Sequence, residues 1–91
     1  MALSGQKTVT TAGTAEALGS QPIGGPIAVK ALASNTGLVV VGNDGASDVT
    51  TSNGFQLSAG ETIIFNRVGN LADLYLDSAV NGEGVCWLAL D

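Results

Sequence analysis

Short apolar runs separated by turn residues recur along this 91-residue chain. The clearest case lies at residues 52–66. There a Ser-Asn-Gly turn precedes Phe55 and Leu57, and a Ser-Ala-Gly-Glu turn precedes the run Thr-Ile-Ile-Phe-Asn at 62–66. β-Branched and aromatic residues in such a run favour a strand over a helix. We therefore expect a strand at 62–66, with Phe55 and Leu57 held in the core between two turns.

Most of the other expected elements are also strands, because alternating or wholly apolar runs are bounded by Gly, Asn, Asp and Pro. Beyond 62–66, strands are expected at residues 6–11, 14–18, 27–33, 38–41, 71–80 and 85–90, with a shorter one around 48–50. Residues 14–18 could instead form one helical turn, although so short a helix is unstable by itself. The Gly- and Pro-rich residues 19–26 are expected to form a loop, and residues 34–37 a hairpin-type connection.

About seven or eight short strands, with no long helix, indicate an all-β fold. We expect a compact antiparallel β-sandwich, jelly-roll-like, that occupies residues 1–91 as a single domain. A chain of this length buries only about 65% of the surface that its unfolded form exposes. Association with other subunits would therefore add to a modest core.

Residues 71–80 show the clearest period-two alternation in the chain. Successive side chains of a strand point to opposite faces, so Leu74 and Leu76 fall on one face and Asp73 and Asp77 on the other. The sequence therefore predicts a strand with an apolar inner face and a solvated outer face that carries both carboxylates.

Candidate contacts with other subunits are the apolar and aromatic side chains that a small core does not obviously need. The Leu-Val-Val-Val run at 38–41 is either buried on both faces within the chain or covered on its outer face by another subunit. Trp and Tyr are enriched at interface hot spots, although a core position is the alternative for the tryptophan. The N-terminal segment 1–7 is either a frayed terminus or a flexible arm that docks on a neighbour. The interface candidates are Leu3, Val39, Val41, Tyr75 and Trp87.

The composition of the chain argues against nucleic-acid binding, an intrachain disulfide and a membrane span. Eight acids against three bases give a net charge of −5, whereas nucleic-acid binding needs a basic surface. There is no histidine, and the single cysteine cannot form an intrachain disulfide. No apolar run approaches the roughly 18 residues of a membrane span, and the N-terminus lacks the apolar core of a signal peptide. We expect a protein made in the cytosol, with no nucleic-acid or membrane partner.

No group of residues specifies a catalytic reaction or a cofactor. Asn43, Asp44 and Asp48 could supply oxygens to calcium, but they lack the spacing of a known calcium loop. Turn formation explains them better. Cys86 has no histidine to activate it and is expected to be a small apolar residue of the last strand. The sequence therefore predicts no metal, cofactor or nucleophile site.

Paired carboxylates are the minimum equipment of a glycosidase, and Glu61, Asp73 and Asp77 are the acids that could form such a pair. Acidic side chains on exposed strand faces are far more often solubility or interface charges. A sandwich of this size also has little depth for a sugar cleft. We therefore expect no catalytic site.

Several segments resemble small virion structural proteins of tailed bacteriophages, of the head-decoration or head-fibre-base kind. The similar segments include Val-Lys-Ala-Leu-Ala-Ser-Asn-Thr-Gly at 29–37, Ser-Asn-Gly-Phe-Gln-Leu-Ser-Ala-Gly-Glu at 52–61, and the stretch from Asn-Leu at 70–71 to Val-Cys-Trp at 85–87. The chain departs from the pattern at the Gly-Pro-rich loop 24–26 and at Val40, where an aromatic residue is common.

The resemblance implies a jelly-roll-like, non-enzymatic protein that decorates and stabilises the capsid as an oligomer, often a trimer. Its implied partners are copies of itself and the major capsid protein or another virion protein, and its implied location is the virion. The alternative is a carbohydrate- or receptor-binding module of a phage tail, because sandwiches often carry sugar sites in their loops.

Overall fold

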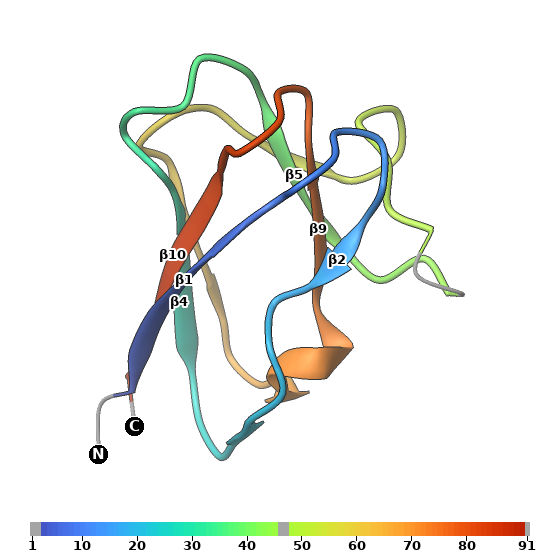
Figure 1. The fold of residues 1–91 in the computed structure, drawn as a ribbon. Helices are drawn as coiled ribbons and strands as arrows, with labels where there is room; N and C mark the ends of the chain where they lie inside the picture. The colour runs from blue at the N-terminus through green and yellow to red at the C-terminus, as the bar shows by residue number, and fades with distance from the viewer. Residues whose placement is uncertain (1–2, 46–47, 91) are drawn as a thin grey trace.

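The computed structural model describes residues 3–45 and 48–90, which form an all-β sandwich (Figure 1). Its elements in chain order are β1 (Ser4–Thr8), β2 (Glu16–Ala17), β3 (Pro22–Ile23), β4 (Ile27–Ala31), β5 (Val39–Gly42), β6 (Phe55–Leu57), β7 (Thr62–Phe65), β8 (Gly69–Asn70), the 3₁₀ turn η1 (Leu71–Asp73), β9 (Tyr75–Ser78) and β10 (Gly84–Ala89). The expectation of a compact antiparallel β fold is confirmed.

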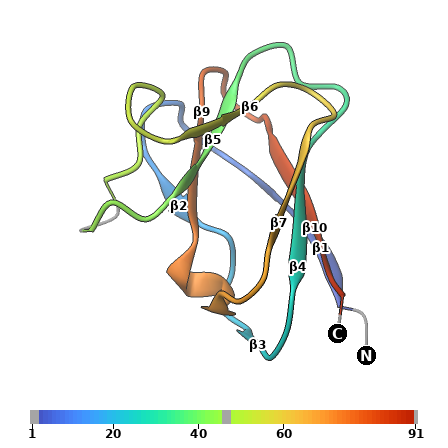
Figure 2. The same cartoon turned by 180° about the vertical axis from the view of Figure 1, so that it is seen from behind.

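The strands pair as one long hairpin that is folded on itself. β1 pairs with β10, β2 with β9, β3 with β8, β4 with β7 and β5 with β6, all antiparallel. Two further antiparallel pairs, β10 with β4 and β5 with β9, form as this hairpin rolls up. The result is sheet A, in the order β1-β10-β4-β7, and sheet B, in the order β2-β9-β5-β6, with β3 and β8 as a separate short pair (Figures 1 and 2).

This topology corrects the expected hairpin at residues 34–37. β4 lies in sheet A and β5 in sheet B, so the connection crosses from one sheet to the other. Within the described residues, β5 and β6 are the only consecutive strands that share a sheet. Local turn residues show where the chain reverses, but they do not show which sheet receives the next strand.

The core lies between the inner faces of the two sheets. In sheet A, Val85, Val29 and Ile63 lie on the inner face, because directly opposed residues of an antiparallel pair share a face. Sheet B contributes Val41 and Leu76, which are opposite each other in β5 and β9. The remaining buried apolar members are Val9, Leu18, Ile23, Ile27, Ala31, Val39, Leu57, Leu71, Leu74 and Ala89.

Several expected elements differ from the structure. Residues 48–50 contain no strand, and the expected loop 19–26 contains the two-residue strand β3. The expected strand 71–80 is divided, because its first residues form η1. The side chain of Asn70 caps η1 by accepting a hydrogen bond from the N–H of Ala72 at 2.9 Å. A polar cap of this kind competes locally with an extended backbone.

The expected solvated position of Asp77 is wrong, because this residue is 1% exposed. It lies opposite Val40 on the outer face of sheet B. Its Oδ1 accepts hydrogen bonds from the N–H groups of Gly13, at 3.0 Å, and of Ser78, at 2.8 Å. The turn that contains Gly13 covers the carboxylate, so period-two alternation identified the face correctly but could not show what packs on that face.

Residues 1–7, expected to be either a frayed terminus or a docking arm, form part of a strand over most of their described length. Ser4–Thr8 is strand β1, and its register places Ser4 opposite Leu88 and Thr8 opposite Gly84. The carbonyl of Leu3 accepts a hydrogen bond from the N–H of Ala89 at 2.7 Å, which extends the pairing by one residue. Residues 1 and 2 lie outside the described residues.

Phe55 and Leu57 lie on the short edge strand β6 and differ in their exposure to solvent. Leu57 is buried opposite Val39, as expected, whereas Phe55 is 57% exposed opposite Val41. In the part of the chain that the structure describes, no strand of sheet B lies beyond β6, so the ring has no neighbouring strand on that side. The expected core position of Phe55 is therefore wrong.

Phe55→Ala should lower the free energy of unfolding by about 1 kcal/mol or less, since little apolar area leaves water at this position. Leu57→Ala, on the same strand, should cost about 2–5 kcal/mol because it empties a buried site. Chemical denaturation of both variants measures the difference. Equal losses would contradict the observed burial.

Gly84 lies where β10 crosses closest to β1. A Cβ atom at this position would overlap the carbonyl oxygen of Lys7 and lie 2.7 Å from the Cα of Thr8, both of which are backbone atoms. Asn35 fixes the same residue from the other side: its Nδ2 donates to the Gly84 carbonyl at 2.9 Å and its Oδ1 accepts from the Gly84 N–H at 3.3 Å. Gly84 therefore sets the spacing of the first and last strands.

Gly84→Ala should lower the free energy of unfolding by about 3 kcal/mol or more, because the clash is with backbone and forces β1 away from β10. Gly60→Ala is the control: its φ is +82°, but open space surrounds the new Cβ, so the cost should be about 1 kcal/mol. Denaturation curves compare the two. A Gly84→Ala protein as stable as Gly60→Ala would exclude the close approach.

Candidate functional site

The outer face of sheet A carries exposed apolar side chains and is the candidate contact surface. Its centre is a row across the sheet in which Leu88, Ala28 and Ile64 lie side by side on β10, β4 and β7. Leu88 is 41% exposed and Ile64 is 58% exposed. The next row contains Gln6, Cys86, Lys30 and Thr62. Lys30 is the one charged side chain that the register places on this face, which we call the sheet A face.

The sheet A face contains a shallow depression of about 270 Å³. Residues Ala28, Lys30, Thr62, Cys86, Trp87 and Leu88 line it. Most of the lining is apolar, and the ammonium group of Lys30 is its only charge. The depression can take an apolar group of a partner, but it offers no set of groups for acid–base chemistry.

The outer face of sheet B is covered by the chain itself. A Cβ on Gly54 would lie 2.6 Å from the Cβ of Val40 and 2.9 Å from Cγ1 of Val49, so the segment around Gly54 passes directly over β5. Val40 and Val49 are both buried. The loop after β5 thus folds back and buries the outer side of the strand, and no second subunit is needed to cover it.

This packing corrects two interface candidates, Val39 and Val41. Both side chains point into the core, opposite Leu57 and Leu76 respectively, and both are buried. They cannot contact another subunit without unfolding of β5. Of the two alternatives for the 38–41 run, burial on both faces within one chain is the one observed for β5.

The aromatic candidates Trp87 and Tyr75 are half-buried and lie on different sheets. The indole of Trp87 packs on Gly5, where an added Cβ would lie 2.9 Å from Cζ2, and it also packs against the core. Tyr75 lies at the start of β9, opposite Ala17 and Gly42. The two rings therefore do not form one exposed platform. Leu3, the last candidate, is half-buried and packs against the core.

The acids that could have formed a catalytic pair are not brought together. Asp77 is buried, as described above. Glu61 lies in the turn before β7, where its Oε1 accepts a hydrogen bond from the N–H of Ser58 at 2.6 Å. Asp73 lies in η1. Strands β7 and β8 separate η1 from the turn that contains Glu61. Residues 3–45 and 48–90 also contain no group of three or more Asp, Glu or Cys residues placed to hold a metal ion.

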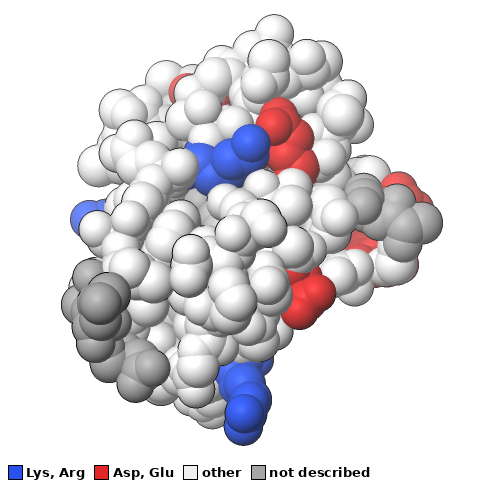
Figure 3. Space-filling model, turned by 60° about the horizontal axis from the view of Figure 1, so that its bottom comes forward, with Lys and Arg blue, Asp and Glu red and all other residues white. Residues whose placement is uncertain are grey.

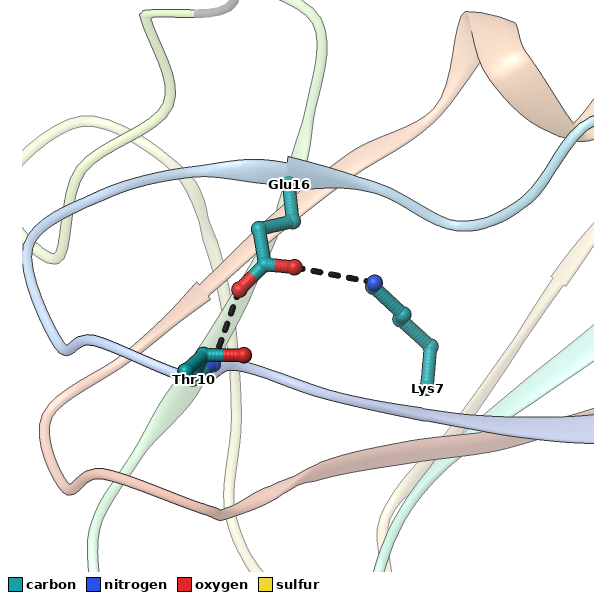
Figure 4. Close-up of polar contacts among 3 residues, drawn as sticks. All are labelled: Lys7, Thr10 and Glu16. Atoms are coloured by element: carbon teal, nitrogen blue, oxygen red, sulfur yellow. Dashed lines mark hydrogen bonds and ion pairs between the residues drawn. The ribbon is translucent and has the colours of Figure 1, made fainter.

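Lys7, Thr10 and Glu16 form a group of polar contacts on the β1–β2 side of the sandwich. On the β1–β2 side, Lys7 Nζ lies 2.9 Å from Glu16 Oε1, and Glu16 Oε2 accepts from the N–H of Thr10 at 2.8 Å (Figure 4). The hydrogen bond from Lys7, with that from Thr10, holds the pKa of Glu16 below its ordinary value. These contacts tie an edge strand of sheet A to an edge strand of sheet B.

Glu83 ties the loop before β10 to the loop before β5. Its Oε1 accepts from the N–H of Gly37 at 3.0 Å, and its Oε2 accepts from the N–H of Thr36 at 2.8 Å and from the hydroxyl of Thr36 at 2.9 Å. The backbone hydrogen bonds from Gly37 and then Thr36 hold the pKa of Glu83 below its ordinary value of 4.5. The carboxylate acts here as a structural clamp between two crossover loops.

Sequence analysis did not single out the residues of the sheet A face. Ile64, Leu88 and Ala28 are separate strand residues in the sequence, and only the register brings them into one row. The alternation of Ile63 and Ile64 in an edge strand is a partial signal, since one of two adjacent isoleucines must point outward. Membership of an edge strand, however, is a property of the whole fold.

The fold and its surfaces define a small antiparallel sandwich with one bare, nearly uncharged outer face. Most of the surface seen in Figure 3 is likewise neither basic nor acidic. In comparisons with protein-family models, curated proteins and solved structures, nothing matches this chain. No helix in the described part of the chain is long and apolar enough to cross a membrane.

Because the pKa values of Glu83 and Glu16 are lowered in the folded state, both carboxylates stabilise the fold above the ordinary value of 4.5 and lose this effect as pH falls through the folded pKa. The free energy of unfolding should therefore fall below pH 4.5. Glu83→Gln should flatten this fall, because an amide cannot ionise and presents only one acceptor oxygen. Denaturation curves at a series of pH values measure the slope.

The salt dependence of stability distinguishes the contribution of Glu16 from that of Glu83. About 1 M salt should weaken the contribution of Glu16, which depends on Lys7, and leave that of Glu83, which depends on backbone donors. If the unfolding free energy of Glu83→Gln falls with pH as steeply as that of the wild type, both at low salt and at about 1 M salt, then the Glu83 carboxylate does not stabilise the fold.

Proposed function

We propose that this protein is a non-enzymatic structural protein of a tailed-bacteriophage particle, which attaches to the capsid in many copies and stabilises it as an oligomer. The observation that carries the proposal is the bare sheet A face. Specific protein contacts have an apolar, charge-depleted centre and a polar rim. The row of Leu88, Ala28 and Ile64 has this character, and Ser4, Gln6 and Thr8 on β1 supply polar neighbours.

The distribution of charge supports attachment through this face. The chain carries a net charge of −5, yet the register places no acid on the strands of the sheet A face. Acids elsewhere keep the protein soluble before assembly, whereas an apolar face without acids can be desolvated at low cost. Lys30 beside the depression suits a partner surface that carries a carboxylate or a carbonyl oxygen.

The strand order also supports the proposal. When the short pair β3–β8 is set aside, the remaining eight strands follow the order 1-8-3-6 in one sheet and 2-7-4-5 in the other. We infer that the sandwich is a jelly roll, an architecture found in viral capsid and lectin domains. A fold alone does not determine function, so this support is by analogy.

The alternative, a carbohydrate- or receptor-binding module of a phage tail, has less support. Such sites generally present exposed aromatic rings, whereas Trp87 packs on Gly5 and Tyr75 lies on the other sheet. Binding of the pure protein to an array of glycans, lost on substitution of Tyr75, would favour this alternative over capsid attachment.

Leu88→Glu should weaken attachment to capsids by at least about tenfold, because it places a charge in the centre of the apolar row. Binding of the purified protein to phage capsids that lack it, measured by co-sedimentation, gives the affinity. Gln56→Glu is the matched control: it adds the same charge to an exposed position of β6, on the other sheet, and should bind as the wild type does.

Failure of the wild-type protein to bind capsids, or equal binding by Leu88→Glu, would reject the proposal. An image reconstruction of the particle gives an independent test. The protein should appear on the capsid surface with sheet A facing the capsid, and density on the tail alone would support the alternative. The resemblance implies a trimer, and light scattering measures the number of copies.

A further inference from the structure

The outer edge of β7 has backbone hydrogen-bonding groups without partners. The N–H of Ala31 donates to the carbonyl of Glu61 at 2.9 Å, which fixes the phase of the β4–β7 ladder. In an antiparallel ladder, pairs that exchange backbone hydrogen bonds alternate with pairs that do not. Ile63 and Phe65 therefore exchange hydrogen bonds with β4. The N–H and C=O groups of Thr62 and Ile64 therefore point away from the sheet. No strand among the described residues lies beyond β7.

β7 itself, Thr62–Phe65, contains no charged residue and no proline, two of the features by which proteins protect edge strands. A bulge lies just before it, where Gly60 and Glu61 both bond the backbone of Ala31. β7 has the sequence Thr-Ile-Ile-Phe, and the side chain of Ile64 is 58% exposed. The opposite edge of the same sheet, β1, contains Lys7, whose side chain is held across the side of the sandwich by Glu16 (Figure 4). One edge is thus protected and the other is open.

The residues that flank β7 make the open edge complementary to itself. Glu61 lies immediately before the strand and Arg67 two residues after it, and both are exposed. Ile64 is midway between them in sequence. If two copies pair antiparallel about a two-fold axis at Ile64, Glu61 and Arg67 flank the paired strands so that the acid of each copy lies on the side of the base of the other, beyond the bend at Asn66. The groups of Thr62 and Ile64 that point outward are those that such pairing uses.

The charges fit this arrangement. Glu61 Oε1 accepts from the N–H of Ser58, and its second carboxylate oxygen is available for a partner. Arg67 makes no ion pair with any described residue. A copy of this chain supplies an acid and a base at the required spacing, whereas an unrelated apolar strand satisfies neither.

We propose that β7 is a self-association edge, through which two copies of this chain pair antiparallel about Ile64 and join their A sheets into one eight-stranded sheet. The pairing makes a dimer in solution, in place of the trimer that the resemblance implies. It leaves Leu88 and the depression of each copy free, so the contact is compatible with the proposed capsid attachment but does not depend on it.

The mass of the pure protein in solution tests the pairing without any capsid. Sedimentation velocity over a range of concentrations should give twice the mass of one chain. Ile64→Lys places two like charges directly opposite each other at the two-fold axis and should raise the dissociation constant at least about tenfold. Gln6→Lys is the matched control, since Gln6 is exposed on the same face at the opposite edge, and it should remain a dimer.

A charge exchange tests the register. Arg67→Glu should weaken the dimer because it opposes two acids, Glu61→Arg should weaken it because it opposes two bases, and the double variant should restore it. Circular dichroism confirms that each variant is folded. A wild-type monomer, a trimer, a dimer unaffected by Ile64→Lys, or a double variant as weak as the single ones would each overturn the proposal.

Discussion

The pairing of the first strand with the last is the contact on which the rest of the sandwich depends. Among residues 3–45 and 48–90, β1 is an edge strand that pairs with β10 alone, while β10 also pairs with β4. This contact joins residues from opposite ends of the chain, and the other pairs of the rolled hairpin are nested inside it. Gly84 permits the close approach, and Asn35 bonds both backbone groups of Gly84 from the adjoining loop. Asn35 thereby ties the connection between β4 and β5 to the pairing of β1 with β10.

Contacts within the chain cover some surfaces of the sandwich and leave others exposed to solvent. The β1–β2 side is closed by Lys7, Glu16 and Thr10, and the outer face of sheet B is closed by the loop that buries Val40 under Val49. The sheet A face and the β7 edge are left open. The sheet A face carries the exposed apolar side chains of Ile64 and Leu88, whereas Leu38, Phe55 and Val80 are exposed elsewhere.

The buried carboxylate of Asp77 shows how the crossover loops contribute to this arrangement. It lies on the outer face of sheet B, where the turn around Gly13 crosses the strands, and it accepts a backbone hydrogen bond from that turn. Glu83 does the same for the loop before β5. Carboxylates thus replace backbone pairing where the chain passes between sheets, and they satisfy N–H groups that no strand can reach.

The sequence by itself determined the all-β class, the positions of most strands and the burial of Leu57, because period-two patterns and turn residues act locally. It also limited the candidate chemistry, since the chain has no histidine, the commonest general base. Only the tertiary structure decided that Phe55 is exposed, that Asp77 is buried, that Val39 and Val41 belong to the core, and that Ile64 and Leu88 share one bare face. Each of these outcomes depends on which strands become edges and which loops fold back over a sheet. Those choices are made by pairing between distant segments, and no local pattern records them.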